Sequence, residues 1–100
     1  MNIELMRLLE NIVRIGVVTE INTDTWELRV QTGGLTTNWI RWNSGRAGKF
    51  KIWIPPSPDE QVFLLCPGGN PETAVSAGSL YSNDNPPPGS LENEMVITAP

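Results

Sequence analysis

The chain has 100 residues, of which 39% are hydrophobic, and its 7 Lys plus Arg against 11 Asp plus Glu give a formal net charge of -4. This length allows one compact domain with a closed core and excludes a second independent core. The negative balance disfavours nonspecific attraction to phosphate backbones and to anionic lipid surfaces. No stretch approaches the roughly 18–20 apolar residues of a membrane-spanning helix, so no stable membrane insertion is expected.

The first predicted element is a short amphipathic helix over residues 3–13. Its apolar residues recur at helical spacing and include Leu5, Leu8, Leu9 and Ile12. Because so short a helix is marginal alone in water, we expect these leucines to pack on the domain or on another copy of the chain. The N-terminus lacks the basic and long apolar stretches of a secretory signal, which predicts a protein made in the cytoplasm.

A period of two replaces the helical period in the next thirty residues. Residues 14–22 are predicted to form the first strand, since β-branched residues dominate an alternating pattern there. A turn over residues 22–25 then leads into a second strand, and we expect Trp26, Leu28 and Val30 to form its apolar face.

Two further β-segments are predicted: residues 37–42, which resume the second strand after the glycine pair at 33–34, and residues 50–54, which form the third strand. In the first of these, Trp39 and either Ile40 or Trp42 are expected to face inward. Alternation along the other predicts one shared apolar face, formed by Phe50, Ile52 and Ile54. The proline pair at residues 55–56 stops the ladder, because proline cannot donate a backbone hydrogen bond.

The closing strands are predicted at residues 62–66 and 74–81, with proline-containing turns before and between them. Short β-segments separated by turns indicate a mainly β protein. The most economical architecture is a small five-stranded OB-fold barrel with a short N-terminal α-helix and an extended C-terminal tail. The predicted organisation is a helix over 1–13, a barrel over 14–82 and a proline-rich linker over 83–100.

The only strand candidate in the tail is the segment Met95-Val96-Ile97-Thr98. A lone strand has no partner for its backbone N–H and C=O groups. We therefore expect this segment to be poorly ordered or to join another chain.

The sequence predicts no catalytic, cofactor or metal site. It contains no histidine, which removes the commonest general base and metal ligand. Asp59 and Glu60 are neighbours on an extended chain, so they point apart and are interpreted as a solvated turn. The glycine pairs at 33–34 and 68–69 lie in no phosphate-binding pattern. Cys66 lies within an apolar run and is interpreted as a small buried core residue.

One sector of the chain is positive. No acid lies between Glu27 and Asp59, whereas five cations do: Arg29, Arg41, Arg46, Lys49 and Lys51. Cations interleaved with tryptophans on an OB barrel suit single-stranded nucleic acid, which is the alternative function. The negative total charge favours instead tryptophans that fill or flank the core, and makes nucleic acid an unlikely partner. A carbohydrate- or peptidoglycan-binding module with an exposed tryptophan is a third hypothesis.

Several segments carry a family resemblance. They are residues 12–16 (IVRIG), 29–34 (RVQTGG), 37–42 (TNWIRW), 46–48 (RAG), 56–62 (PSPDEQV) and 77–86 (AGSLYSNDNP). In their order and spacing, over about residues 8–88, they resemble the N-terminal part of phage baseplate assembly protein V (gpV), the spike protein of contractile phage tails. The resemblance to the VgrG spike proteins of type VI secretion is looser.

The resemblance implies a structural role, not an enzyme. The expected protein is an OB-fold homotrimer in the virion tail baseplate of a phage or prophage, at the base of the central spike used in tail assembly and envelope penetration. It would contact hub or tail-tube proteins. The histidine motif that holds iron at the spike tip has no counterpart here, so no metal is carried over. We expect this chain to be the base of a spike separated from its needle.

If the chain self-associates, its exposed apolar side chains are the expected interface residues. Three copies around an axis present identical surfaces to one another, so apolar side chains that one copy exposes can be buried in the assembly. The predicted oligomer or partner interface consists of Leu5, Leu8, Leu9, Trp42, Trp53, Met95 and Ile97.

Overall fold

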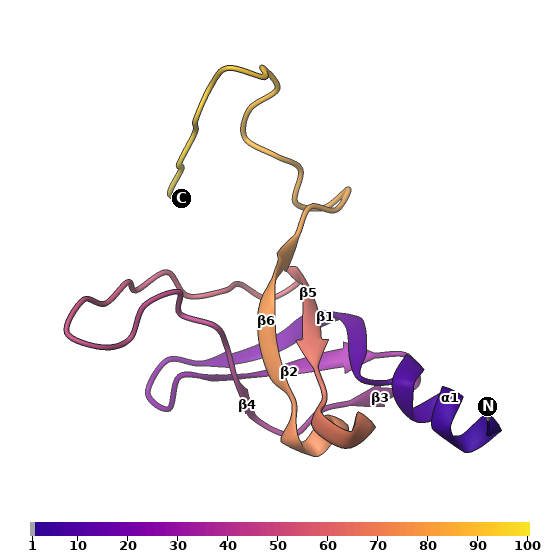
Figure 1. Ribbon diagram of the computed structural model, residues 1–100. Helices are drawn as coiled ribbons and strands as arrows, with labels where there is room; N and C mark the ends of the chain where they lie inside the picture. The colour runs from indigo at the N-terminus through magenta and orange to yellow at the C-terminus, as the bar shows by residue number, and fades with distance from the viewer. Residues whose placement is uncertain (1) are drawn as a thin grey trace.

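The computed structural model describes residues 2–100, apart from the side chains of residues 8–10. A short helix leads into a curved antiparallel sheet, and the last twenty residues rise away from it (Figure 1). The elements are α1 (Ile3–Glu10), β1 (Val13–Asn22), β2 (Glu27–Thr32), β3 (Leu35–Thr36), β4 (Ile40–Arg41), β5 (Gln61–Leu65), the 3-10 turns η1 (Pro67–Gly69) and η2 (Pro71–Thr73), and β6 (Val75–Leu80). The predicted mainly β class with a short N-terminal helix is confirmed. No helix in the described part of the chain is long and apolar enough to cross a membrane.

The sheet is arranged as an interrupted barrel. Its strand order is β3-β2-β1-β5-β6, and β4 pairs with β2 beside β3. The paired strands do not close into a cylinder, but Trp42 and Ser76 form an isolated parallel bridge across the open side, and the Asn43 N–H donates to the Ser76 carbonyl at 2.8 Å. The open side therefore lies between the end of β4 and β6.

The sheet has six strands, not the predicted five, because one edge strand is split. Between β3 and β4 the Thr37 hydroxyl accepts from the Val30 N–H at 3.0 Å, and the Thr37 N–H donates to the Val30 carbonyl at 2.9 Å. A side-chain oxygen thus replaces a backbone acceptor at this point of the ladder. β3 and β4 pair with successive parts of β2, so together they occupy one strand position.

The core lies on the concave side of the sheet. It consists of Val18, Leu28, Val30, Ile40, Val62, Leu64, Cys66 and Ala74. Alternation along each strand places these residues on one face, as the period of two requires. A register shift in β1 between Val18 and Glu20 adds a residue opposite β2, and such bulges increase the twist and bend a sheet toward a barrel.

Two tryptophans that were predicted to face inward, Trp26 and Trp39, are exposed instead. Trp26 has a φ of 59°, belongs to the β1–β2 turn and is 59% exposed. The turn that connects β1 with β2 contains four residues, and Trp26 is the last of them, so it precedes the strand. Trp39 is exposed, whereas Ile40 is buried and Trp42 is half-buried against the core.

The predicted strand at 50–54 is wrong. The segment has one isolated bridge, between Ala47 and Lys51, and otherwise forms no ladder in the described part of the chain. The side chain of Phe50 is 86% exposed, and those of Ile52 and Ile54 are exposed too. Alternation favours a strand only where a sheet edge is available. Here the near end of β2 is already paired with Ile40–Arg41 of β4.

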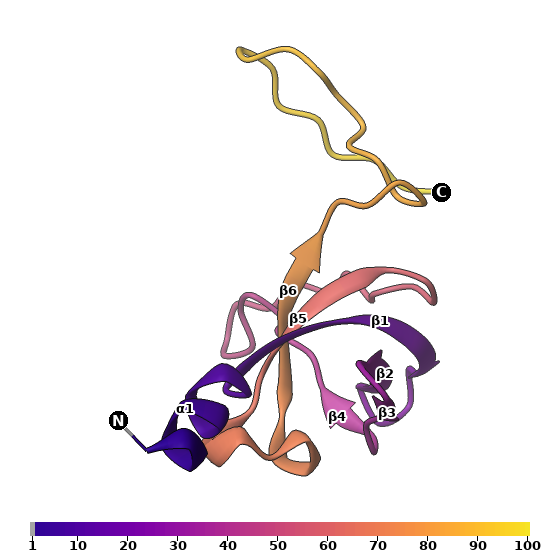
Figure 2. The same cartoon turned by 90° about the vertical axis from the view of Figure 1, so that its right-hand side faces the viewer.

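The tail leaves the end of β6 and contains no strand among residues 81–100 (Figures 1 and 2). Met95 and Ile97 are 89% and 86% exposed. Near its end the tail forms a turn in which the Glu94 carboxylate accepts from the N–H groups of Leu91 and Ser90, and these bonds lower the pKa of Glu94. That the strand candidate joins another chain stays a prediction.

Cys66 is fully buried, as predicted. Burial raises the pKa of the thiol above its ordinary value, and the nearby Arg14 charge opposes this only in part. We expect the folded protein to react with a thiol-specific disulfide reagent at about pH 8 far more slowly than the urea-unfolded chain, because the thiolate is the reactive form. Equal rates in the two states would contradict the burial of this residue. The raised pKa also means that stability declines as the pH rises through the thiol range.

Candidate interaction surfaces

The outer side of the sheet carries an apolar surface opposite the core. It comprises Val13, Ile15, Val17, Phe63, Leu65 and Val75, which we call the outer β face. Five of these side chains, all except Phe63, are more than a third exposed. The strand register aligns them in rows that cross the sheet. One row runs from Val13 through Leu65 to Val75, and the next pairs Ile15 with Phe63.

The second row ends on β6 at a glycine, Gly78. Phe63 lies opposite Gly78 of β6, and a Cβ on Gly78 would approach the Phe63 ring to 2.8 Å. The absence of a side chain at this position lets the ring lie against β6. β1 therefore has apolar residues on both faces, which is typical of a strand covered on both sides. In a single chain only its inner side is covered.

Helix α1 extends the apolar surface at the N-terminal end. Ile3, Leu5 and Met6 are exposed, and the helix lies beside η1 and the start of β1 (Figure 2). The side chains of Leu8 and Leu9 lie outside the described part, so their predicted interface role stays a prediction.

A second surface lies at the other end of the barrel. It is a groove of about 450 Å³ lined mainly by Trp26, Arg41, Trp42, Arg46, Lys51 and Trp53. We call it the tryptophan groove. Three elements contribute to it: the β1–β2 turn, β4, and the loop between β4 and β5. The rings of Trp42 and Trp53 lie 5.8 Å apart at an interplanar angle of 51°, within the range of favourable aromatic pairs.

The loop that forms one wall of this groove is anchored by Asn43. Its side-chain amide donates to the Ala77 carbonyl at 3.0 Å, and its side-chain oxygen accepts from the Gly45 N–H at 2.8 Å. Gly45 has a φ of 82°, which allows the chain to reverse. The loop then closes on itself, because the Ile52 N–H donates to the Arg46 carbonyl at 3.2 Å. Arg46 and Lys51 consequently stand beside the same groove.

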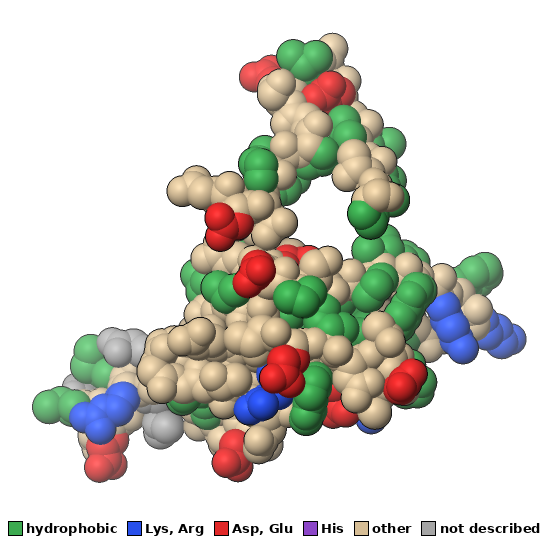
Figure 3. Space-filling model, turned by 180° about the vertical axis from the view of Figure 1, so that it is seen from behind, with side chains coloured by type: hydrophobic (Ala, Val, Ile, Leu, Met, Phe, Trp, Pro, Cys, Tyr) green, Lys and Arg blue, Asp and Glu red, His purple; other side chains and the backbone are tan. Residues whose placement is uncertain are grey.

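The charge of this end of the molecule is positive. Lys and Arg side chains gather at the projecting end of the β4–β5 loop, with apolar side chains on the surface next to them (Figure 3). Among the described residues, the one ion pair within 4.0 Å joins Arg29 and Glu20, so the cations of the groove pair with no carboxylate there. Glu27 is the ladder partner of Arg41 and is the nearest acid in the strand pairing.

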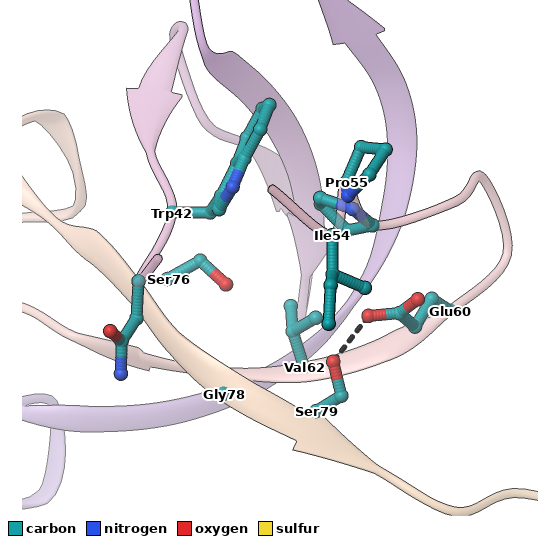
Figure 4. A pocket seen from close by; sticks show the side chains of 10 residues that line it. Trp42, Ile54, Pro55, Glu60, Val62, Ser76, Gly78 and Ser79 are labelled. Carbon is teal, nitrogen blue, oxygen red and sulfur yellow. Dashed lines mark hydrogen bonds between the residues drawn. The ribbon is translucent and has the colours of Figure 1, made fainter. Parts of the chain in front are cut away.

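A smaller pocket of about 220 Å³ lies at the open side of the barrel (Figure 4). Trp42 and Val62 line it, and Ile54 and Pro55 cover one side. The Glu60 carboxylate accepts from the Ser79 hydroxyl and from the Ser57 N–H at 3.2 Å. Glu60 thus connects the turn before β5 with β6. A single carboxylate that already accepts two hydrogen bonds offers no second group for acid–base chemistry. Within residues 2–100, apart from the side chains of residues 8–10, no group of three metal-ligating side chains converges.

Of the predicted interface residues whose side chains are described, the structure brings Trp42 and Trp53 together in one site. Trp42 and Trp53 share the tryptophan groove, whereas Leu5 lies at the opposite end of the barrel and Met95 and Ile97 lie on the projecting tail (Figure 1). The sequence reasoning missed the outer β face. A signal for it was present, since Val17 and Val18 are adjacent apolar residues that must occupy both faces of one strand.

Residues 14–81 match the family model described as the type VI secretion system/phage-baseplate injector OB domain. The chain belongs to this family, which confirms both the OB fold and the resemblance found in the sequence. It is also similar to a protein named "Spike protein" of Escherichia phage P2, with 40% identity over 97 residues. That match covers 97% of this chain and 46% of the relative, so the chain spans about half the length of the relative.

Proposed function

We propose that the chain is the OB-fold base of the central spike of a contractile phage or prophage tail, and that it acts as a structural part of the virion baseplate. The observation that carries this proposal is the similarity to the phage P2 spike protein along nearly the whole chain. The hub or tail-tube proteins are its expected partners, and the host cytoplasm is where it would be made.

The barrel would act by holding its neighbours in fixed positions. In this proposal three copies surround an axis, and each outer β face, with α1 beside it, is covered by a neighbouring copy. Burying apolar side chains contributes about 25 cal/mol per Å² of apolar surface removed from water, and this gain must exceed the entropic cost of association. In a closed ring of three, the same interface repeats around the axis, and the outer β face of each copy would pack on a different surface of the next copy.

The tail fits the same role. Residues 83–100 form the proposed linker to a spike segment, after an N-terminal segment at 1–13 that contains α1 and a barrel segment at 14–82. Three prolines at 86–88 favour an extended, semi-rigid chain that leads away from the barrel. In an assembly around an axis, three tails would leave side by side. The lone strand candidate at 95–98 would then find partners in its own copies.

The solution mass tests the proposed assembly. Sedimentation equilibrium at roughly 100 μM of the 100-residue chain should give three times the monomer mass of 11.0 kDa. Mass action favours the associated state at this concentration, which is far above the dissociation constant of most stable interfaces. A strict monomer at that concentration would contradict self-association through this domain.

A further inference from the structure

We propose that the tryptophan groove is a docking site for a short acidic segment of another protein, one that presents a large apolar side chain between carboxylates. This inference rests on the proposed function only in that a baseplate component must hold other proteins. It concerns the end of the barrel opposite α1, not the outer β face.

The apolar part of the groove is accessible in the single chain. Trp26 and Trp53 are 59% and 57% exposed, and Ile52 is 49% exposed. Large exposed aromatic side chains that surround a concavity are typical of interaction sites. A volume of about 450 Å³ suits one or two side chains of a partner. Trp42 is half-buried and also packs against the core, which holds its ring in place in the groove.

The charged part of the groove favours a negatively charged ligand. Arg41, Arg46 and Lys51 line it, and among the described residues none of the three lies within 4.0 Å of a carboxylate. The Arg46 guanidinium donates only to the Gly45 carbonyl at 3.3 Å, which leaves most of its N–H groups free. Carboxylates can accept two parallel bonds from such a group, and the aromatic surroundings reduce the screening by water.

The distribution of charge favours a short acidic peptide over a polynucleotide. Asp24 lies in the same turn as Trp26, and Glu27 is the ladder partner of Arg41, so carboxylates border the positive surface on the side of Trp26. A polynucleotide that continued past Trp26 would bring phosphates beside these acids. A peptide with two or three carboxylates around one apolar side chain would fit within the positive surface.

The test is an unbiased selection followed by charge reversal. A display library of random dodecapeptides is selected against the whole 100-residue protein. We expect the enriched peptides to carry net negative charge and at least one large apolar residue. Arg46→Glu and Lys51→Glu should each weaken binding of a selected peptide about tenfold or more, read as quenching of tryptophan fluorescence. Binding should also weaken as salt is raised.

Lys49→Glu is the matched control, since Lys49 belongs to the same loop but does not line the groove. It should change affinity by less than about threefold, because an exposed charge outside the contact is screened by water and salt. The inference is overturned if the enriched peptides are neutral or basic, if the three variants bind alike, or if oligothymidine binds more tightly than any selected peptide.

The outcome is separable from that of the proposed function. The groove variants should keep the mass of the unmodified protein, because they lie away from the outer β face. Peptide binding by a monomeric protein would support the groove and contradict the assembly. A trimeric protein that selects no acidic peptide would support the assembly and contradict the inference about the groove.

Discussion

Replacing Val30 by aspartate is expected to lower the free energy of unfolding by about 3–5 kcal/mol. Val30 is fully buried in β2 and belongs to the core cluster. In the described structure no cation faces this position from the core residues packed around it, so the new carboxylate would be charged without a partner or would bind a proton at a cost. Urea unfolding followed by tryptophan fluorescence measures the change as a shift of the midpoint.

Gln31→Asp provides the control, because Gln31 is the next residue of the same strand and is exposed on the opposite face. It should change stability by less than about 1 kcal/mol. If Val30→Asp does not fold at all, Val30→Ala keeps the comparison measurable, with an expected loss of roughly 1.5–3 kcal/mol from the removed methyl groups and the cavity. Equal midpoints for the variants at positions 30 and 31 would mean that the strand faces are reversed.

The sequence predicted the parts of the fold in which alternation and sheet pairing agree. The predicted strands at 14–22, 62–66 and 74–81 correspond closely to β1, β5 and β6, and the inward position of Val30 is correct. These strands pair with one another or with β2 along most of their length. Local pattern and long-range pairing therefore favour the same structure.

Prediction from the sequence failed where the sheet offers no free edge, and where a turn contains a residue that was expected in a strand. Residues 50–54 alternate like a strand, but the adjacent part of β2 is already paired with β4. The split between β3 and β4 depends on the Thr37 hydroxyl reaching the Val30 N–H, a contact that no periodicity encodes. Trp26 was assigned to the strand for its apolar character, although its positive φ places it in the turn.

The candidate surfaces were harder to predict than the fold. The pairing of Trp42 with Trp53 depends on how the β4–β5 loop folds back, which Asn43 and Gly45 determine locally. The positive charge of the 28–58 interval was visible in the sequence, whereas its concentration on one groove was not. The outer β face needed the register of three strands, because its rows join residues about 50 positions apart.

Glutamate in place of Ile15 is expected to convert the self-associated protein into a monomer without unfolding it. Ile15 is 55% exposed at the centre of the outer β face, next to Phe63 on β5. In one chain the new carboxylate reaches water. At a buried contact between copies it would cost roughly 2–4 kcal/mol, which corresponds to roughly a 30- to 800-fold increase in the dissociation constant.

Ile54→Glu is the matched control for Ile15→Glu. It replaces the same residue type at a position that is 73% exposed in the β4–β5 loop, outside the outer β face. Sedimentation equilibrium should give the monomer mass for Ile15→Glu and an unchanged mass for Ile54→Glu, while the two variants should unfold at the same urea midpoint. Because each subunit of a symmetric assembly carries the substitution, its cost recurs at every interface. An Ile15→Glu protein that retains the mass of the parent would place the contact between copies on a different surface.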